Sequence, residues 1–186
     1  MTIYLKTSEI IGLPVVTVKG GEDEAEIRDV IYSGEGGALL GFTLNKRGFL
    51  RGRMREVLTA ESVSAIGADA VMIEDDDCLI GRGEAPEEVA SPPKDRNVLG
   101  DAVVTETGVR LGTVSDLVLA VGGRGEIIGY QLKRDDSKEA WFIPRPQQLA
   151  VSGDALLVPD ALEKYVSHDL TGFALAVDRY ESEGSA

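Results

Sequence analysis

The sequence predicts an all-β protein of two tandem small β-barrels, with short helices in the linker and in the C-terminal region. Two observations support this fold class. A series of landmark segments occurs twice in the same order, and short apolar or β-branched runs alternate with glycine clusters in both halves. Such runs are typical of strands that are joined by hairpins. Because each copy has about 80 residues, far more than a solenoid repeat, we expect each copy to contain its own core.

The duplication is visible in three pairs of segments. Gly12 aligns with Gly100, and Asp69 aligns with Asp154. The paired segments are 8–16 with 96–104, 34–41 with 122–129, and 68–73 with 153–158. Small insertions and deletions separate these landmarks, and their shared order indicates a duplicated domain.

Strands are expected throughout both halves. The expected spans are 14–19, 27–32, 39–44, 63–66 and 70–73 in the first half, and 113–121, 127–132, 148–151 and 155–158 in the second. Five or six short strands in about 80 residues favour a small barrel or a curled sheet, because closure removes the exposed edges that promote aggregation.

The segment between the copies is rich in proline and charged residues, which is typical of a connection between domains. We therefore expect a first domain at 1–84, a linker at 85–95, and a second domain with a C-terminal extension at 96–180. The polar end, 181–186, is expected to be a disordered tail.

Helices are expected only at the joins. One or two turns follow Pro86 within 85–90, and a second short helix spans 161–166 with Asp160 as its N-cap. The apolar stretch 172–178 is expected to pack as an extra strand or a helical turn.

The bulk composition restricts the function. The net charge is −13 at pH 7, and the acidic excess is spread over both halves, which argues against general DNA binding. Cys78 is the only cysteine, so no intrachain disulfide can form, and this fits a reducing compartment. The sequence shows no signal peptide and no stretch of about 20 apolar residues, so we expect a cytoplasmic protein without a membrane span.

The second copy carries the clearest motif of the chain. Its segments are Val98–Val104, Gly108–Val118, Gly125–Tyr130, Trp141–Pro144 and Gly153–Val158. On these segments, each copy resembles a PRC-barrel domain, the module shared by the cytoplasmic part of the photosynthetic reaction centre H subunit and the C-terminal half of a bacterial ribosome maturation factor. The resemblance implies a six-stranded small β-barrel that serves as an adaptor, and it does not imply an enzyme.

The first copy departs from this motif at three places. It has Ala25-Glu26-Ile27 where the second copy has Gly112-Thr113-Val114. Its counterpart of Ile143-Pro144, near Leu58-Thr59, lacks the proline, and it inserts residues 47–55.

Several residues of the motif have a structural explanation. Gly108 and Gly112 are expected to permit tight turns with positive φ. Asp116 is expected to accept backbone hydrogen bonds at a hairpin. The glycine cluster 122–125 lies between two strands, so it favours a hairpin turn over a phosphate-binding loop, which requires a helix N-terminus.

The sequence contains no catalytic constellation. Nucleophilic catalysis needs a nucleophile and a base within hydrogen-bond reach. His168 lies beyond both predicted barrels, and the acidic neighbours of Cys78 oppose thiolate formation. One cysteine and one histidine cannot form a zinc site, and the acidic run 74–77 lacks the calcium-loop spacing. We therefore expect no catalytic residue, no metal site and no cofactor.

One segment differs between the copies in a way that suggests a contact surface. Five bases lie within ten residues around Phe49, whereas the matching segment 133–145 contains acidic residues. Arginine makes forked contacts with carboxylates and phosphates, so this segment either docks a partner or forms a solvated hairpin. Trp141 is a second candidate for partner binding, and the alternative is that its side chain packs in the core. The candidate partner-binding residues are Lys46, Arg47, Phe49, Arg51, Arg53, Arg55 and Trp141.

These features predict a non-enzymatic interaction or scaffold module, an adaptor that binds another protein or itself, as a homodimer or a higher oligomer. Two alternatives remain open. A ribosome- or RNA-associated factor would use segment 46–55, and its binding would weaken steeply with salt. A small-ligand-binding protein would hold its ligand between the barrels, and the ligand would stabilise the fold.

Overall fold

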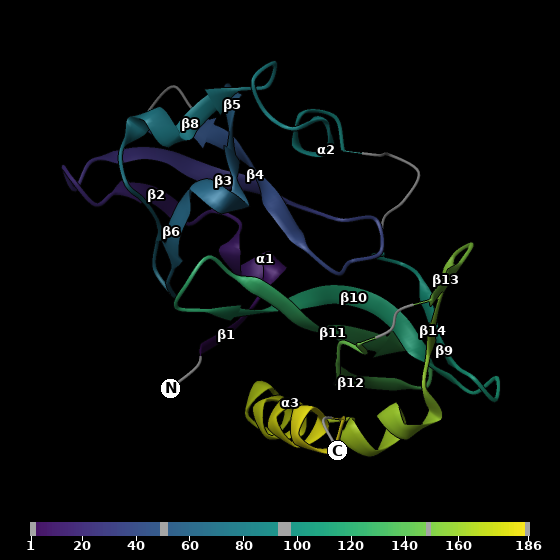
Figure 1. Ribbon diagram of the computed structural model, residues 1–186. Coiled ribbons are helices and arrows are strands. Elements are labelled where there is room, and N and C mark those ends of the chain that lie inside the picture. The colour runs from purple at the N-terminus through teal and green to yellow at the C-terminus, as the bar shows by residue number, and fades with distance from the viewer. Residues whose placement is uncertain (1–2, 49–51, 93–97, 148–149, 185–186) are drawn as a thin grey trace. The chain divides into compact units, whose positions relative to one another are not determined.

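A computed structural model describes residues 3–48, 52–92, 98–147 and 150–184 of the chain. The described residues are mostly β and form two compact units, each with its own curled sheet (Figure 1). Unit 1 comprises Met1–Ser33, Ala38–Lys94 and Leu119–Glu126, and unit 2 comprises Gly34–Gly37, Asp95–Val118 and Ile127–Ala186. Each unit is therefore one copy of the duplicated sequence together with a short hairpin turn of the other copy.

Unit 1 is built on a sheet with the strand order β6-β7-β2-β3-β4-β5-β8. Its elements are β1 (Ile3–Lys6), α1 (Thr7–Ile10), β2 (Pro14–Thr17), β3 (Asp23–Tyr32), β4 (Leu39–Lys46), β5 (Arg53–Thr59), the 3₁₀ turn η1 (Ala60–Ser62), β6 (Val63–Ile66), β7 (Val71–Ile73), the 3₁₀ turn η2 (Asp76–Cys78), β8 (Leu79–Gly81) and α2 (Glu87–Ala90). The short helix expected after Pro86 is present as α2.

The core of unit 1 follows from the period of its strands, in which alternate side chains point to the same face of the sheet. Ala25 and Ile27 of β3 have no exposed surface. On another side of the sheet, Val89 of α2 packs against Ile31 and Val57. Unit 1 thus buries apolar side chains both inside the curled sheet and beneath α2.

Unit 2 repeats this plan with the strand order β12-β11-β10-β9-β14-β13. Its elements are β9 (Ala102–Thr105), β10 (Arg110–Val121, of which residues 119–121 belong to unit 1), β11 (Glu126–Arg134), β12 (Ser137–Pro144), β13 (Ala150–Ser152), β14 (Ala155–Val158), the 3₁₀ helix η3 (Asp160–Tyr165) and α3 (Leu170–Gly184). The buried ring of Phe173 in α3 lies 6.0 Å from that of Phe142 in β12.

The two sheets share the same pairing. Val15 of β2 pairs in parallel with Val71 of β7, and Val103 of β9 pairs in parallel with Leu156 of β14. Likewise, Gly41 faces Thr59 in unit 1 while the aligned Gly129 faces Pro144 in unit 2. These residues occupy matching positions in the repeated segments, so the structure confirms the internal duplication.

The C-terminal helix differs from the expectation. α3 has 15 residues and includes residues 181–184, for which disorder was predicted; residues 185–186 lie outside the described residues. Tyr165 of η3 donates a hydrogen bond to Glu183, and its ring lies 5.2 Å from that of Tyr180. These contacts with η3 offset the entropy lost when the polar end of the chain becomes helical. The molecule is therefore mostly β rather than all-β.

The predicted N-cap role of Asp160 is wrong. Pro159 is the N-cap residue of η3, and Asp160 is the first residue of that helix. The Asp160 carboxylate instead accepts hydrogen bonds from the amide and the hydroxyl of Thr107, at 3.1 and 2.8 Å. These hydrogen bonds lower the pKa of Asp160, because they stabilise its charged form.

The two glycines of the family-like motif behave differently. Gly108 has the expected positive φ of 86°, whereas Gly112 lies within β10, where the register with β9 shifts, and is not in the positive-φ region. A Cβ atom at Gly112 would lie 2.9 Å from the carbonyl oxygen of Lys133, so glycine is needed there for a close approach of backbones. Asp116 is buried within β10, and its carboxylate accepts a hydrogen bond from the amide of Leu117 at 2.9 Å.

Candidate functional site

The strongest candidate for a binding surface lies on the β11–β12 hairpin of unit 2. Trp141 of β12, the only tryptophan of the chain, is half-buried. The guanidinium carbon of Arg134 lies 4.2 Å from the centroid of the Trp141 ring, and the ring of His168 meets it edge-on at 5.4 Å. We call these three side chains the Trp141 cluster.

Strand register explains why these side chains meet. Trp141 pairs with the fully buried Leu132 of β11, so the two share a face of the sheet. The register of the hairpin shifts between Leu132 and Arg134, and from beyond this irregularity the Arg134 side chain reaches the Trp141 ring. On the other side of β12, Phe142 and Ser167 exchange backbone hydrogen bonds of 2.8 and 3.0 Å, which brings His168 alongside Trp141. Trp141 thus lies where the core ends, with part of its side chain buried and part exposed.

Arg134 is held in place by a forked ion pair. Its Nε and Nη2 atoms donate to the two carboxylate oxygens of Asp136 at 2.8 and 2.7 Å. The hydrogen bond to Asp136 raises the pKa of Arg134, and the same bond lowers the pKa of Asp136. Both groups therefore remain charged at neutral pH, and the fork fixes the plane of the guanidinium beside the Trp141 ring.

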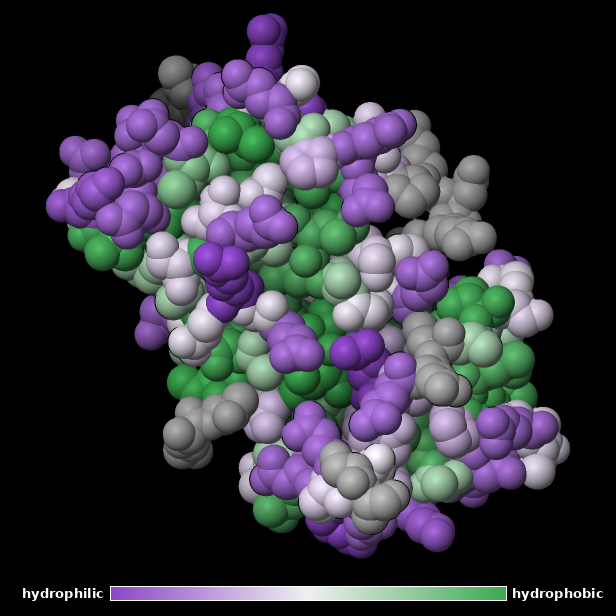
Figure 2. All heavy atoms as spheres, viewed as in Figure 1, coloured by the Kyte–Doolittle hydropathy of each residue, from purple (hydrophilic) through white to green (hydrophobic). Residues whose placement is uncertain are grey.

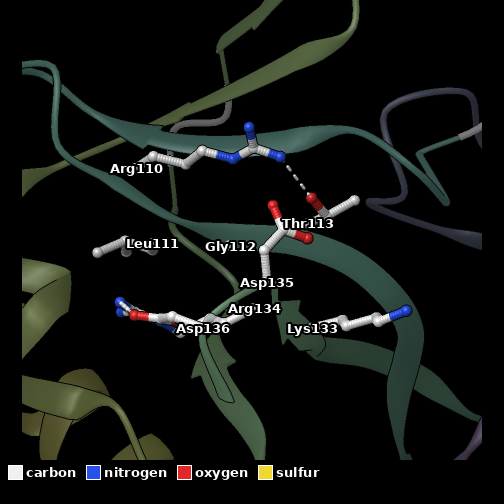
Figure 3. Close-up of a pocket in the computed structure, with 8 residues that line it drawn as sticks. All are labelled: Arg110, Leu111, Gly112, Thr113, Lys133, Arg134, Asp135 and Asp136. Atoms are coloured by element: carbon white, nitrogen blue, oxygen red, sulfur yellow. Dashed lines mark hydrogen bonds and ion pairs between the residues drawn. The ribbon is translucent and has the colours of Figure 1, made fainter. Parts of the chain in front are cut away.

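Two open hollows adjoin Arg134. They have volumes of about 170 and 550 Å³, and Lys133, Arg134 and Asp135 line both. Figure 3 shows the smaller hollow, in which Arg110 of β10 extends on the opposite side from Arg134 and donates to the Thr113 hydroxyl at 2.8 Å. Residues of β12 also line the larger hollow. The walls of both hollows carry charged groups of both signs.

The smaller hollow depends on the glycine at position 112. A side chain there would collide with Lys133 O at 2.9 Å and approach the Cβ of Leu132 to 3.1 Å. The absence of a side chain lets β10 and β11 pack closely and leaves the space above them open.

The chemistry of the Trp141 cluster favours binding. His168 Nδ1 lies 3.8 Å from a carboxylate oxygen of Glu139, and both side chains are exposed. The cluster offers an aromatic ring, a guanidinium and an imidazole, which are the groups of an aromatic or cation–π contact. In the described ranges, no group of three or more histidine, cysteine, aspartate or glutamate residues could hold a metal ion.

The predicted basic segment is only partly described. Lys46 ends β4, and Arg53 and Arg55 lie on β5; all three are exposed. Arg47 is paired within unit 1, with its Nε and Nη2 atoms 3.0 and 2.6 Å from Asp23 Oδ2 and its Nη1 atom 3.1 Å from Glu26 Oε2. The hydrogen bond to Asp23 raises the pKa of Arg47. Phe49 and Arg51 lie outside the described residues.

The remaining sequence features lie apart from the Trp141 cluster. Cys78 is half-buried in η2, with its Sγ atom 4.0 Å from a carboxylate oxygen of Asp75. Among the helices of the described segments, none has both the length and the apolar composition needed to cross a lipid bilayer.

Two residues of the cluster were not singled out by the sequence. Arg134 is one of several charged residues around a hairpin turn, and nothing local marks it as the one that lies beside Trp141. His168 is recognisable in the sequence only as a lone histidine near a helix end. Their proximity to Trp141 arises from register and from the single bridge at Phe142, which are non-local features.

The comparison with known families agrees with the fold and the repeat. The model of the PRC-barrel domain matches the chain twice, at residues 4–79 and 94–164. The chain belongs to the PRC-barrel family. No curated protein is similar enough to the chain to count as a relative.

The two PRC-barrel matches separate family features from additions. The Trp141 ring and Arg134 lie inside the second match, whereas His168 and all of α3 lie beyond it. In the first PRC-barrel domain the match ends at residue 79, so most of β8 and all of α2 follow it. The Trp141 cluster therefore combines two residues inside the second PRC-barrel match with one residue that lies beyond it.

Proposed function

We propose that this protein is a non-enzymatic interaction module that binds a partner protein through the Trp141 cluster. The observation that carries the proposal is the placement of the only tryptophan, which is half-exposed beside a guanidinium that is itself fixed by an ion pair. PRC-barrel domains serve typically as interaction modules, and this supports the proposal at the level of the family.

The chemistry of the cluster resembles that of interface hot spots. Tryptophan and arginine are enriched among the residues that dominate binding energy. A half-exposed Trp141 retains apolar surface that a partner can cover, and the fork to Asp136 reduces the entropy that Arg134 would lose on binding. The adjoining hollow of about 550 Å³ has room for a large side chain of the partner. The partner suited to this surface presents an aromatic or apolar side chain next to a carboxylate.

The test compares Trp141→Ala with Leu175→Ala, a change at the most exposed apolar side chain of α3. A partner recovered by affinity purification from the native cell should be retained by Leu175→Ala and lost by Trp141→Ala. With the purified partner, Trp141→Ala should weaken binding by about tenfold or more, as expected for a hot spot. In the parent protein, the fluorescence of the only tryptophan should shift when the partner binds. Equal recovery of every partner by both variants would reject the proposal.

A second candidate function is supported by the basic segment. Within the described part of the chain, Lys46, Arg53 and Arg55 form no ion pair, although the protein is strongly acidic. Unpaired exposed bases suit an acidic partner such as RNA. Arg53→Glu/Arg55→Glu should abolish co-sedimentation with ribosomal particles at low salt, whereas Lys164→Glu in η3 should not. If the parent protein does not co-sediment at low salt, this candidate fails.

A further inference from the structure

The outer edge of β13 has no role in either of the functions proposed above. β13 is the last strand in the sheet order of unit 2, and among the described strands it pairs only with β14. Its three residues are all exposed, and the side chain of Val151 is 38% exposed. Figure 2 shows hydrophobic side chains where Figure 1 draws β13 and β14, at the right of the view.

The hairpin register shows which backbone groups this edge presents. A two-residue turn, Gly153–Asp154, joins β13 to β14, and Ser152 pairs with Ala155 next to it. The pair that closes such a turn exchanges hydrogen bonds, and the pairs of an antiparallel ladder alternate between bonded and non-bonded. Val151, opposite Leu156, is therefore in a non-bonded pair, so its N–H and C=O point away from β14.

Unit 1 contains the same hairpin with its edge covered. Ile66 pairs with Val71 in β6–β7, as Val151 pairs with Leu156, and the turn is closed by a hydrogen bond from Gly67 N to Ala70 O. The outward N–H of Ile66 donates to Gly123 O, and the outward C=O of Ile66 accepts from Gly122 N, both at 2.9 Å. Ile66 has no exposed surface. At this position the fold thus has room for a pairing segment.

Within the described segments, nothing covers the edge at Val151, and β13 lacks the features that usually protect an edge strand. Among the described residues, none forms a hydrogen bond with the outward groups of Val151. The opposite edge of the same sheet is covered, because Ser167 bonds to Phe142. β13 also contains no lysine, proline or bulge, which are the devices that usually prevent pairing between sheet edges.

We propose that β13 pairs with β13 of a second copy of this chain, antiparallel and across a two-fold axis centred on Val151. A residue that presents both N–H and C=O at an edge is self-complementary under such an axis, so the two Val151 residues exchange both hydrogen bonds. Charge also favours this place. Each chain of the dimer carries a net charge of −13, whereas Asp154 is the only charged residue between 150 and 158. Two copies therefore meet with little repulsion along this hairpin, and the 38% exposed Leu157 adds apolar surface nearby.

The dimer does not depend on the Trp141 cluster, which lies on a different hairpin. Trp141→Ala should leave the dimer intact, and the dimer-breaking variants should keep the tryptophan-dependent partner. The two proposals therefore fail separately.

The experiment measures sedimentation velocity of the full chain across the micromolar range. Val151→Pro removes the outward N–H without breaking the ladder to β14, and Val151→Lys places a charge on the edge. Val109→Lys, at another exposed valine of unit 2, is the matched control. The parent protein and Val109→Lys should sediment as dimers, and both Val151 variants should sediment as monomers with an unchanged circular dichroism spectrum.

A second readout uses the unmodified protein. The amide hydrogen of Val151 should exchange more slowly as the protein concentration rises, which remains measurable even if Val151→Pro does not fold. A parent protein that is monomeric at every concentration would overturn the proposal, including the case in which a strand of a different protein protects Val151. Dimers that persist in both Val151 variants would overturn it as well.

Discussion

At the scale of single residues, the repeated glycines serve the backbone, in two different ways. Gly12 and Gly100 have φ angles of 91° and 97°, a region that other residues rarely adopt. Gly41 and Gly129 instead allow neighbouring strands to approach, because a Cβ atom would lie 2.4 Å from Leu58 O and Ile143 O respectively. The sequence predicts that glycine matters at these positions. It cannot distinguish the two roles, because the close approach is defined by the neighbouring strand.

Gly129→Ala should lower the free energy of unfolding by about 2–3 kcal/mol, because the added methyl group collides with backbone and with Phe173. Gly41→Ala should have an effect of similar size. Gly123→Ala is the control, since no atom lies within 4 Å of its Cβ position, and its effect should stay within about 0.5 kcal/mol. Urea unfolding of the three variants measures these differences. Similar midpoints for Gly129→Ala and Gly123→Ala would contradict the prediction.

At the scale of elements, the strands were more predictable than the helices. β6 and β14 have the predicted bounds, since β-branched and apolar runs between turn residues define them locally. α3 was underestimated, although Phe173, Ala176 and Val177 have helical spacing. Gly172 and the polar end obscured this signal. The placement of η3 was predicted closely, but its tie to Thr107 is a contact between distant segments and has no local signature.

The tie between Asp160 and Thr107 should make the stability depend on pH. The pKa of Asp160 is lowered in the folded state by the Thr107 hydrogen bonds. Its stabilising effect is therefore complete above the unfolded pKa of about 3.9 and is lost as the pH falls through the lower folded value. Asp160→Ala should destabilise the protein at pH 7 and much less at the acidic end of this window. Urea unfolding at several pH values measures the difference.

A matched control for this tie removes the other partner. Thr107→Val should destabilise the protein at pH 7 by less than Asp160→Ala, because the Thr107 amide still donates to Asp160. The effect of Thr107→Val should shrink when Asp160 is already alanine, because the hydroxyl has then lost this acceptor. Fully additive effects would show that Asp160 acts through other groups.

At the scale of the whole molecule, the duplication and the family could be predicted from the sequence, because both rest on short repeated segments. The exchange of hairpin turns could not. Leu119–Glu126 belongs to unit 1 and Gly34–Gly37 to unit 2, where Gly36 O accepts a hydrogen bond from Tyr130 at 3.2 Å. Both turns are merely glycine-rich, and nothing local indicates which sheet they contact. Within the Trp141 cluster, the sequence identifies Trp141 as a candidate. It does not identify Arg134 and His168, because strand pairing brings these residues next to Trp141.

The net charge is also a property of the whole molecule. Hydrophilic side chains are spread over both units on the face shown in Figure 2, and the net charge is −13. Self-repulsion should therefore oppose the compact state at neutral pH. Adding sodium chloride at pH 7 should raise the free energy of unfolding, and the gain should shrink near the isoelectric point of about 4.5. Unfolding by heat or by urea, at several salt concentrations and at both pH values, measures this gain. Guanidinium chloride is avoided because it is itself a salt. A loss of stability with salt at pH 7 would contradict this prediction.

Because Leu119–Glu126 belongs to unit 1, it also affects when the first domain can finish folding during synthesis. β2 leaves the ribosome early, but its parallel neighbour β7 emerges only after four intervening strands, β3 to β6. Even then, Ile66 at the sheet margin waits for Gly122 and Gly123, which are synthesised well into the second copy. The N-terminal half of a nascent chain therefore carries an unfinished sheet for much of translation. The first-made domain is consequently completed only after part of the second copy has been synthesised.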